Sequence, residues 1–311
     1  MIHSSRQLKD LIRNLSKEVG IEPYVLIRKY MMERFLERVS KSKYNGSFIL
    51  KGGMLVSAFV GIEARATMDI DTTIKGIPVT ITDMERTITE ISNIDLEDNV
   101  KFRIKKVSEI MDEAEYSGIR FSMDAVLDGA VIPLKIDIST GDVITPREIS
   151  YSYKLMFEDR TIPIMTYPVE TVLAEKLETV ISRSITNTRM RDFYDIHLLL
   201  QLQRIDNDVL ALALERTAKK RGSLNLLENA ENVLKAVNLS DDMKKMWSTY
   251  QKKFRYAGAY SWDDIMWSVR KLSVEAKLNV EKPSVLEKIK QIQKQDNNSI
   301  RTATKEKEHE R

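Results

Sequence analysis

Apolar residues recur at helical spacing over the first part of the chain and predict two helices there. From Leu8 to Leu15 they follow the i, i+3, i+4, i+7 pattern of one amphipathic helix. Gly20 interrupts that pattern, and a second helix is expected to begin near Pro23, since proline is favoured in the first turn of a helix. We therefore expect residues 1–43 to form N-terminal helices packed on the core of the protein.

The spacing changes to period two after residue 43, which is typical of strands. An Asp128-Gly129 turn joins the last two apolar runs and predicts a tight antiparallel hairpin. A mixed α/β core over 44–165 is the simplest interpretation. Strands are predicted at 48–50, 65–74, 118–126 and 131–139, and a helix at 80–92.

Helical spacing returns at Pro168, which is expected near the first turn of a helix. Another helix should begin near Arg191, and several more should lie between 205 and 280, so 166–287 is predicted to be a helical C-terminal domain. The segment 288–311 lacks sustained apolar content and is expected to be frayed or disordered. The predicted fold class is α+β.

Composition excludes several function classes. With 42% hydrophobic residues among 311, a sizeable core can form, and the absence of cysteine excludes disulfides, thiolate zinc sites and a cysteine nucleophile. No apolar run is long enough to span a membrane and no signal peptide is apparent, so we expect a soluble cytoplasmic protein. The net charge of +3 gives no argument for nucleic-acid binding. His3, His197 and His309 are too scattered for a metal site, and His197 is expected to pack between helices.

The predicted strand at 65–74 carries the first candidate chemistry. Alternation places Arg65, Thr67, Asp69 and Asp71 on one polar face. Two carboxylates so close repel each other by about 1 kcal/mol in water and about 4 kcal/mol near a protein surface, so a positive partner is expected. Upstream, the glycine pair at 52–53 would let a helix begin close to a phosphate chain, which points to a divalent metal with a nucleotide.

Asp137 supplies a third carboxylate, on the polar face of the predicted strand 131–139. If that strand neighbours the first, Asp69, Asp71 and Asp137 converge and can bind one or two Mg²⁺ ions, with Asp137 assisting an attacking hydroxyl. The alternative is that each aspartate faces solvent without a role. The order of a glycine pair, an Asp-x-Asp and a later strand aspartate favours the site.

Lys176 lies beside the apolar stripe of the helix that begins near Pro168, so it should be at least half buried. A buried ammonium needs a charge partner or a ligand phosphate. Asp192 and Asp195, at i and i+3 of the next helix, can supply that charge. The pairing could be structural, or it could help to hold a nucleotide and its acceptor.

Other motifs are either absent or ambiguous. No Gly-x-Ser-x-Gly and no P-loop occurs, so acyl-enzyme hydrolases and Walker-type NTPases have no support. A set of aromatic residues among lysines could stack on RNA bases or could pack in the interior. These residues are Tyr250, Phe254, Tyr256, Tyr260 and Trp262.

Five segments, in this order, resemble the AbiEii/AbiGii toxin family: 48–53, 65–71, 134–138, 174–177 and 191–195. The resemblance implies a polymerase-β-like nucleotidyltransferase core, a helical C-terminal domain and a co-encoded type IV antitoxin, which need not touch the toxin. It also implies growth arrest and abortive infection of phage. Related toxins transfer nucleotides from an NTP to the 3′ end of tRNA, so Mg²⁺, GTP or a pyrimidine NTP, and tRNA are the expected cofactor, substrate and partner, with the toxin as a monomer.

The resemblance also implies roles for particular residues. Asp69, Asp71 and Asp137 would hold Mg²⁺, Lys176 with Asp192 or Asp195 would match the later motifs, and Gly52, Gly53, Arg65 and Thr67 would lie near the phosphates. Two departures stand out: Met54 follows the glycine pair where many nucleotidyltransferases have serine, and 15 residues separate Gly53 from Asp69. Transfer to a protein side chain, a GTP-binding regulatory module without turnover, and a helical partner-binding protein stay open as alternatives.

Overall fold

The computed structural model describes residues 2–111 and 117–282, and it has an α+β fold built on one mixed sheet. The strand order is β3-β4-β5-β2-β1-β7-β6, and the central strands β2 and β5 are parallel neighbours. The strands are β1 (Phe48–Lys51), β2 (Ile70–Ile74), β3 (Val100–Met111), β4 (Ser117–Leu127), β5 (Ala130–Thr140), β6 (Ile149–Lys154) and β7 (Thr161–Thr166).

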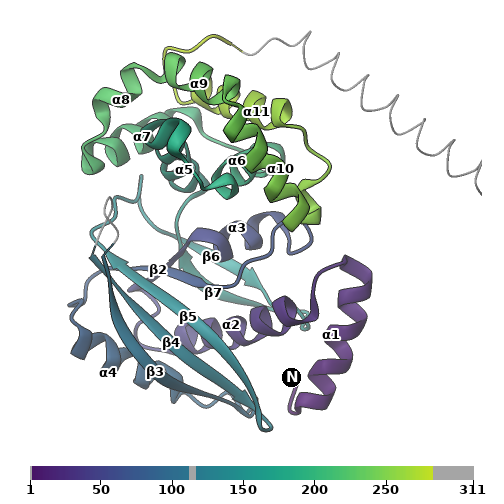
Figure 1. Cartoon of the computed structure of the whole chain (residues 1–311). Helices are drawn as coiled ribbons and strands as arrows, with labels where there is room; N and C mark the ends of the chain where they lie inside the picture. The colour runs from purple at the N-terminus through teal and green to yellow at the C-terminus, as the bar shows by residue number, and fades with distance from the viewer. Residues whose placement is uncertain (1, 112–116, 283–311) are drawn as a thin grey trace, which may run out of the picture.

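The N-terminal helices form as the sequence predicts. Helix α1 (Ser5–Val19) ends at Gly20, whose φ of 68° is the left-handed conformation that glycine favours. Helix α2 (Pro23–Lys41) has proline in its first turn and packs against β5 and β7, so that it covers one face of the sheet (Figure 1). Most of its charged residues are buried but paired, as in the bidentate contact of Arg38 with Asp98.

Among the described residues, two further helices complete the core, and the helices from α5 onward gather at the other end of the molecule (Figure 1). Helix α3 contacts both β1 and β2, and helix α4 contacts β3. Within the part of the chain that the structure describes, no helix combines the length and apolar character needed to cross a bilayer. The helices are α3 (Gly52–Val60), α4 (Ile81–Ser92), α5 (Val169–Arg183), α6 (Met190–Leu202), α7 (Asn207–Arg221), α8 (Leu224–Glu228), α9 (Ala230–Leu239), α10 (Asp241–Lys253) and α11 (Trp262–Glu275).

The structure confirms the Asp128-Gly129 hairpin between β4 and β5 and the helix at 80–92. The predicted strand 65–74 was wrong in its first half, because β2 begins only at Ile70. In the segment that precedes β2, the Arg65 side chain donates a hydrogen bond to Asp195 in α6. The predicted disordered tail at 288–311, and His309 within it, lie outside the described residues.

Candidate active site

Four charged residues form one row across four neighbouring strands. Arg120 of β4 is paired in register with Asp137 of β5, Asp137 with Asp71 of β2, and Asp71 with Lys51 of β1. Residues paired across strands project from the same face of a sheet. The row therefore reads positive, negative, negative, positive, with the two carboxylates at its centre.

The pKa of Asp71 shows that the centre of the row would be stabilised by additional positive charge. Burial and the neighbouring Asp137 carboxylate raise the pKa of Asp71, although Lys51 opposes that shift. Arg120 donates to both Asp137 oxygens, at 2.8 and 2.6 Å. The centre of the row is thus a place where further positive charge is stabilising.

The glycine pair lets the chain approach Asp71 closely. A Cβ on Gly52 would lie 2.1 Å from the Asp71 Oδ2 atom, and φ of Gly52 is +64°, so no other residue fits there without displacing the carboxylate. The Gly53 backbone N–H donates to the same Oδ2 atom at 3.4 Å. A Cβ on Gly53 would meet Thr67 Oγ1 at 2.6 Å, so Thr67 packs behind this turn.

Asp69 does not join the row. It precedes β2, and its carboxylate accepts a hydrogen bond from Arg28 of α2 at 3.2 Å. Within residues 2–111 and 117–282, no group of three or more histidine, aspartate or glutamate side chains is spaced to hold a metal ion. The convergence of Asp69, Asp71 and Asp137 stays a prediction: the Asp69 charge contributes to the raised pKa of Asp71, while its carboxylate also contacts Arg28.

Lys51 is held by a buried carboxylate that the sequence did not single out. Its ammonium lies 2.5 Å from Asp142 Oδ2, which also accepts from Ser139, Tyr167 and Thr73. Burial alone would raise the pKa of Asp142, but Lys51 and these hydrogen bonds hold it below its ordinary value. Asp142 therefore fixes the ammonium of Lys51 as a permanent positive charge at one end of the row.

Lys176 has the aspartate partners that were predicted for it. Its ammonium donates to Asp192 Oδ1 at 2.9 Å and to Asp195 Oδ2 at 2.7 Å. Asp195 also accepts from Arg65 Nε at 2.6 Å. Burial would lower the pKa of Lys176, but the two aspartates outweigh it and the pKa is raised. The lysine therefore carries its charge at the wall between α5 and α6.

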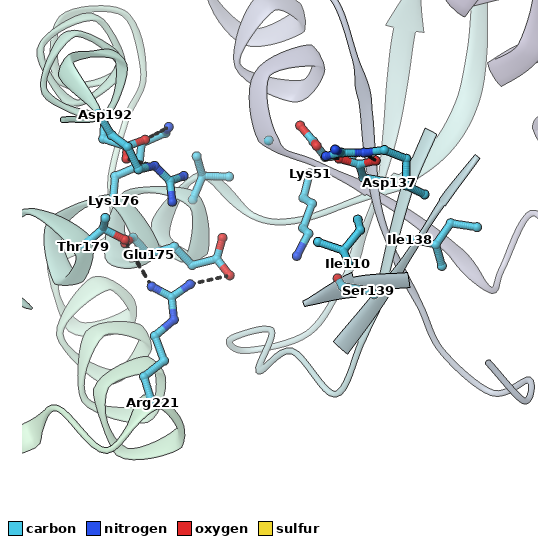
Figure 2. Close-up of a pocket in the computed structure, with 16 residues that line it drawn as sticks. Lys51, Ile110, Asp137, Ile138, Ser139, Glu175, Lys176, Thr179, Asp192 and Arg221 are labelled. Carbon is cyan, nitrogen blue, oxygen red and sulfur yellow. Dashed lines mark hydrogen bonds and ion pairs between the residues drawn. The ribbon is translucent and has the colours of Figure 1, made fainter. Parts of the chain in front are cut away.

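A cavity of about 240 Å³ lies between the row and these helices (Figure 2). Five of the predicted site residues line it, namely Gly52, Asp71, Asp137, Lys176 and Asp192. The other predicted residues do not line the cavity. Gly53 lies against Thr67, Asp69 contacts Arg28, and Arg65 contacts Asp195.

Sequence reasoning missed several basic residues of this cavity. Arg120 and Arg189 line it together with Lys51 and Arg221. Arg221 of α7 contacts Glu175 and Thr179 of α5 (Figure 2). Alternation along β4 could have placed Arg120 on the polar face, but nothing local indicates that α7 reaches this cavity.

The remaining candidates pack in the interior. His197 is buried, as predicted, between Ser268 and Gln201. Tyr194 lies at the centre of the predicted aromatic set and stacks on Tyr256, with ring centroids 5.1 Å apart. The aromatic residues thus form a cluster that α6 and α10 share, with Phe254 as a partly exposed member.

A carboxylate pair on a mixed sheet, a glycine turn that opens a helix beside it and a basic cavity facing it are typical of enzymes that transfer phosphoryl or nucleotidyl groups. The chain belongs to the AbiEii nucleotidyl transferase toxin family of type IV toxin–antitoxin systems, whose family model matches residues 34–269. The predicted family, fold class and nucleotidyltransferase class are confirmed.

Solved structures with a related chain path include JHP933 from Helicobacter pylori, which is 15% identical, with 90% of this chain and 99% of that chain covered and a TM-score of 0.49. An antigenic nucleotidyltransferase-like protein from Paracoccidioides brasiliensis is 14% identical, with 67% and 93% covered and a TM-score of 0.38. No curated protein matches the sequence.

Proposed function

We propose that this toxin transfers a nucleoside monophosphate from an NTP to the 3′ hydroxyl of an RNA, with tRNA as the natural acceptor. The observation that carries the proposal is the register pairing of Asp71 with Asp137 beside the Gly52 turn. It puts two carboxylates at one edge of a cavity whose opposite wall carries Lys176.

The carboxylates fit Mg²⁺, because that ion prefers oxygen ligands and because burial and the neighbouring Asp137 carboxylate make the charge of Asp71 unfavourable until a cation compensates it. When bound, Mg²⁺ would neutralise triphosphate charge and lower the pKa of the attacking hydroxyl. Asp69, Asp71 and Asp137 would be its protein ligands. Asp69 contacts Arg28 and Asp137 contacts Arg120, and both carboxylates would exchange these contacts for the ion.

At the α-phosphorus the reaction forms one P–O bond and breaks one, and one proton is transferred. The 3′ oxygen attacks the α-phosphorus of the NTP, pyrophosphate leaves, and the hydroxyl proton passes to the Asp137 carboxylate. Lys176 and Arg189 face the cavity and would bind the charged phosphates, while the backbone at Gly52 lets the triphosphate come close. Asp192 would orient both cations, and Asp195, Arg65 and Thr67 would support these groups from behind.

The remaining assignments follow from the family and are part of the proposal. Residues 44–165 would act as the catalytic domain and 166–287 as the domain that presents the acceptor. GTP or a pyrimidine NTP would be the donor. Transfer would stop growth and block phage propagation, and it would be opposed by a co-encoded antitoxin that need not bind the toxin. The protein would act as a monomer in the cytoplasm, where NTPs and tRNA occur.

The test is to incubate the purified protein with each α-labelled NTP, Mg²⁺ and total bacterial RNA and to separate the products on a denaturing gel. A labelled band of tRNA size is expected with one preferred NTP. Asp71→Asn should abolish it, because the substitution removes a central charge from the row at little change in volume. Asp124→Asn is the matched control, since Asp124 lies in the same sheet but pairs with Lys105.

Two results would contradict the proposal. Label on a polypeptide instead of RNA would indicate protein modification. No label in the presence of measurable NTP binding would indicate a regulatory module without turnover. Loss of label in both variants would show that the sheet, and not the charge at position 71, was disturbed.

A further inference from the structure

A second hollow of about 560 Å³ opens next to the candidate active site, between the start of α6 and the C-terminal half of α10. We call it the α6–α10 groove. Its floor contains the aromatic side chains of Tyr250 and Phe254. The basic residues that line it are Arg189, Arg191, Lys245 and Lys253.

The groove and the candidate active site share a wall. Arg189 and Asp192 line both of them. Asp192 accepts from Lys176 through Oδ1, while its Oδ2 lies 2.9 Å from the Arg189 Nε atom. A chain lying in the groove would therefore pass Arg189 on its way to the carboxylates of the sheet.

The charge of the groove suits a polyanion. Four of its lining residues are basic, and Asp192, its acidic lining residue, is already bound to Lys176. Lys245 pairs with Asp242 and Arg189 pairs with Asp192, but the Lys245 side chain is 77% exposed and that of Arg189 is 45% exposed, so both can reach a ligand. Such side chains would contact phosphates and release counterions.

The aromatic floor distinguishes a single strand from a duplex. Phe254 is a partly exposed residue; its ring stacks on Tyr256 with centroids 5.5 Å apart, and the Lys253 ammonium lies 5.5 Å from its centroid. Base faces that are stacked inside a duplex cannot reach such a ring, whereas the bases of a single strand can. Basic side chains around an aromatic ring are the usual platform for single-stranded nucleic acid.

We propose that the α6–α10 groove binds the single-stranded end of the acceptor RNA, namely the nucleotides just before its 3′ hydroxyl. This assignment rests on the proposed RNA acceptor and adds to it the surface that holds the strand. Phosphates would contact Lys245 and Lys253, a base would stack on Phe254, and the terminal nucleotide would pass Arg189 and Asp192 into the active site.

The experiment compares two double variants of the same helix. Lys245→Ala/Lys253→Ala removes two charges from the groove, and Lys244→Ala/Lys252→Ala removes two exposed charges of α10 that do not line it. Fluorescence anisotropy of a labelled single-stranded RNA oligonucleotide, measured over a salt series, gives the affinity and its salt slope. Steady-state transfer gives KM for RNA and for NTP separately.

The groove variant should lose about 1.4 from the slope of log K against log salt, since each single-strand phosphate contact contributes about 0.7. Relative to equal affinities at 1 M salt, this corresponds at 0.1 M salt to an RNA affinity about 25-fold weaker, with a matching rise in KM for RNA and an unchanged KM for NTP. The control should stay within about twofold of the parent protein.

The outcomes separate this assignment from the proposed function. Suppose that the parent protein labels RNA but both double variants behave alike, or that only KM for NTP rises in the groove variant. Either result would show that the groove does not hold the acceptor, and the proposed transfer to RNA would be unaffected. If the parent protein labels only polypeptide, the RNA acceptor is refuted and this assignment falls with it.

Discussion

Replacement of Asp195 by asparagine tests whether the carboxylate that links the core to the helical end is structural. Asp195 is completely buried, and it accepts from Arg65, itself 1% exposed, and from Lys176. Arg65 and Lys176 outweigh the effect of burial and hold the pKa of Asp195 below its ordinary value. The variant keeps the shape of the side chain but turns an amide N–H group toward one of the two cations.

The structure sets the expected magnitude. Removing one partner of a buried ion pair costs about 3–5 kcal/mol, because the opposite charge is left without compensation. Lys176 keeps Asp192 and Arg65 keeps a backbone contact with Ala66, so we expect the lower end, about 3 kcal/mol. That is a large share of the 5–15 kcal/mol typical of a folded domain.

Urea unfolding followed by circular dichroism measures this loss, with Asp192→Asn as the comparison. The Asp192 variant should lose only about 1 kcal/mol, since Arg189 is nearly half exposed and Lys176 keeps Asp195. Its transfer activity should fall much further, because Asp192 lines the cavity and Asp195 does not.

The sign of the pH effect gives a second check. A carboxyl with a lowered pKa stabilises the fold above its ordinary value of 3.8, and that contribution is lost as the pH falls below it. The difference in stability between the parent protein and Asp195→Asn should therefore shrink in acid. A loss below 1 kcal/mol at pH 7, or a difference that grows in acid, would refute the structural role of Asp195.

Three further predictions concern the row. Asp71→Asn should abolish transfer and should raise the melting temperature of the metal-free protein near pH 7. The gain in stability is expected because the raised pKa of Asp71 means that its ionisation destabilises the fold above the ordinary pKa. Calorimetry from pH 4 to 8 should show this gain growing with pH. Lys51→Met should cost about 3 kcal/mol in urea unfolding, by leaving the buried Asp142 carboxylate without a cation, and Asp142→Asn should recover part of it. Arg120→Ala should free Asp137 and so tighten Mg²⁺ binding about fivefold in titration calorimetry. The effect is modest because Arg120 is 41% exposed. Weaker Mg²⁺ binding in this variant would show instead that Arg120 supports the site.

Local patterns were sufficient to predict much of this fold. Gly20 and Pro23 mark helix ends through backbone conformation alone, and they fall where the sequence indicates. The alternation that follows the Asp128-Gly129 turn places Asp137 on the polar face of its strand. The aspartate partners of Lys176 were predictable for a similar reason, since a lysine beside an apolar stripe must be compensated.

Contacts between distant segments were not predictable in the same way. Strands β3 and β6 are the two edges of the sheet and are more exposed, so their apolar signal is weak. Alternation brings the charge of Asp69 close to Asp71, but it gives no sign that Arg28, 41 positions earlier in a helix, contacts the Asp69 carboxylate. The periodicity of apolar residues gives no information about such a long-range ion pair.

The register of two parallel strands decides whether this protein has a site at all. Asp71 and Asp137 are neighbours only because β2 and β5 pair in parallel with these residues opposite each other. A slip by one residue would turn Asp137 toward the buried face that Leu134 and Ile136 fill, and the core would lose its apolar side chains to solvent at the same time. The burial that stabilises β5 and the charge pair that we propose as catalytic are therefore fixed by the same register. A substitution that shortens Leu134 or Ile136 on the apolar face of β5 should reduce activity as well as stability, even though neither residue lines the cavity.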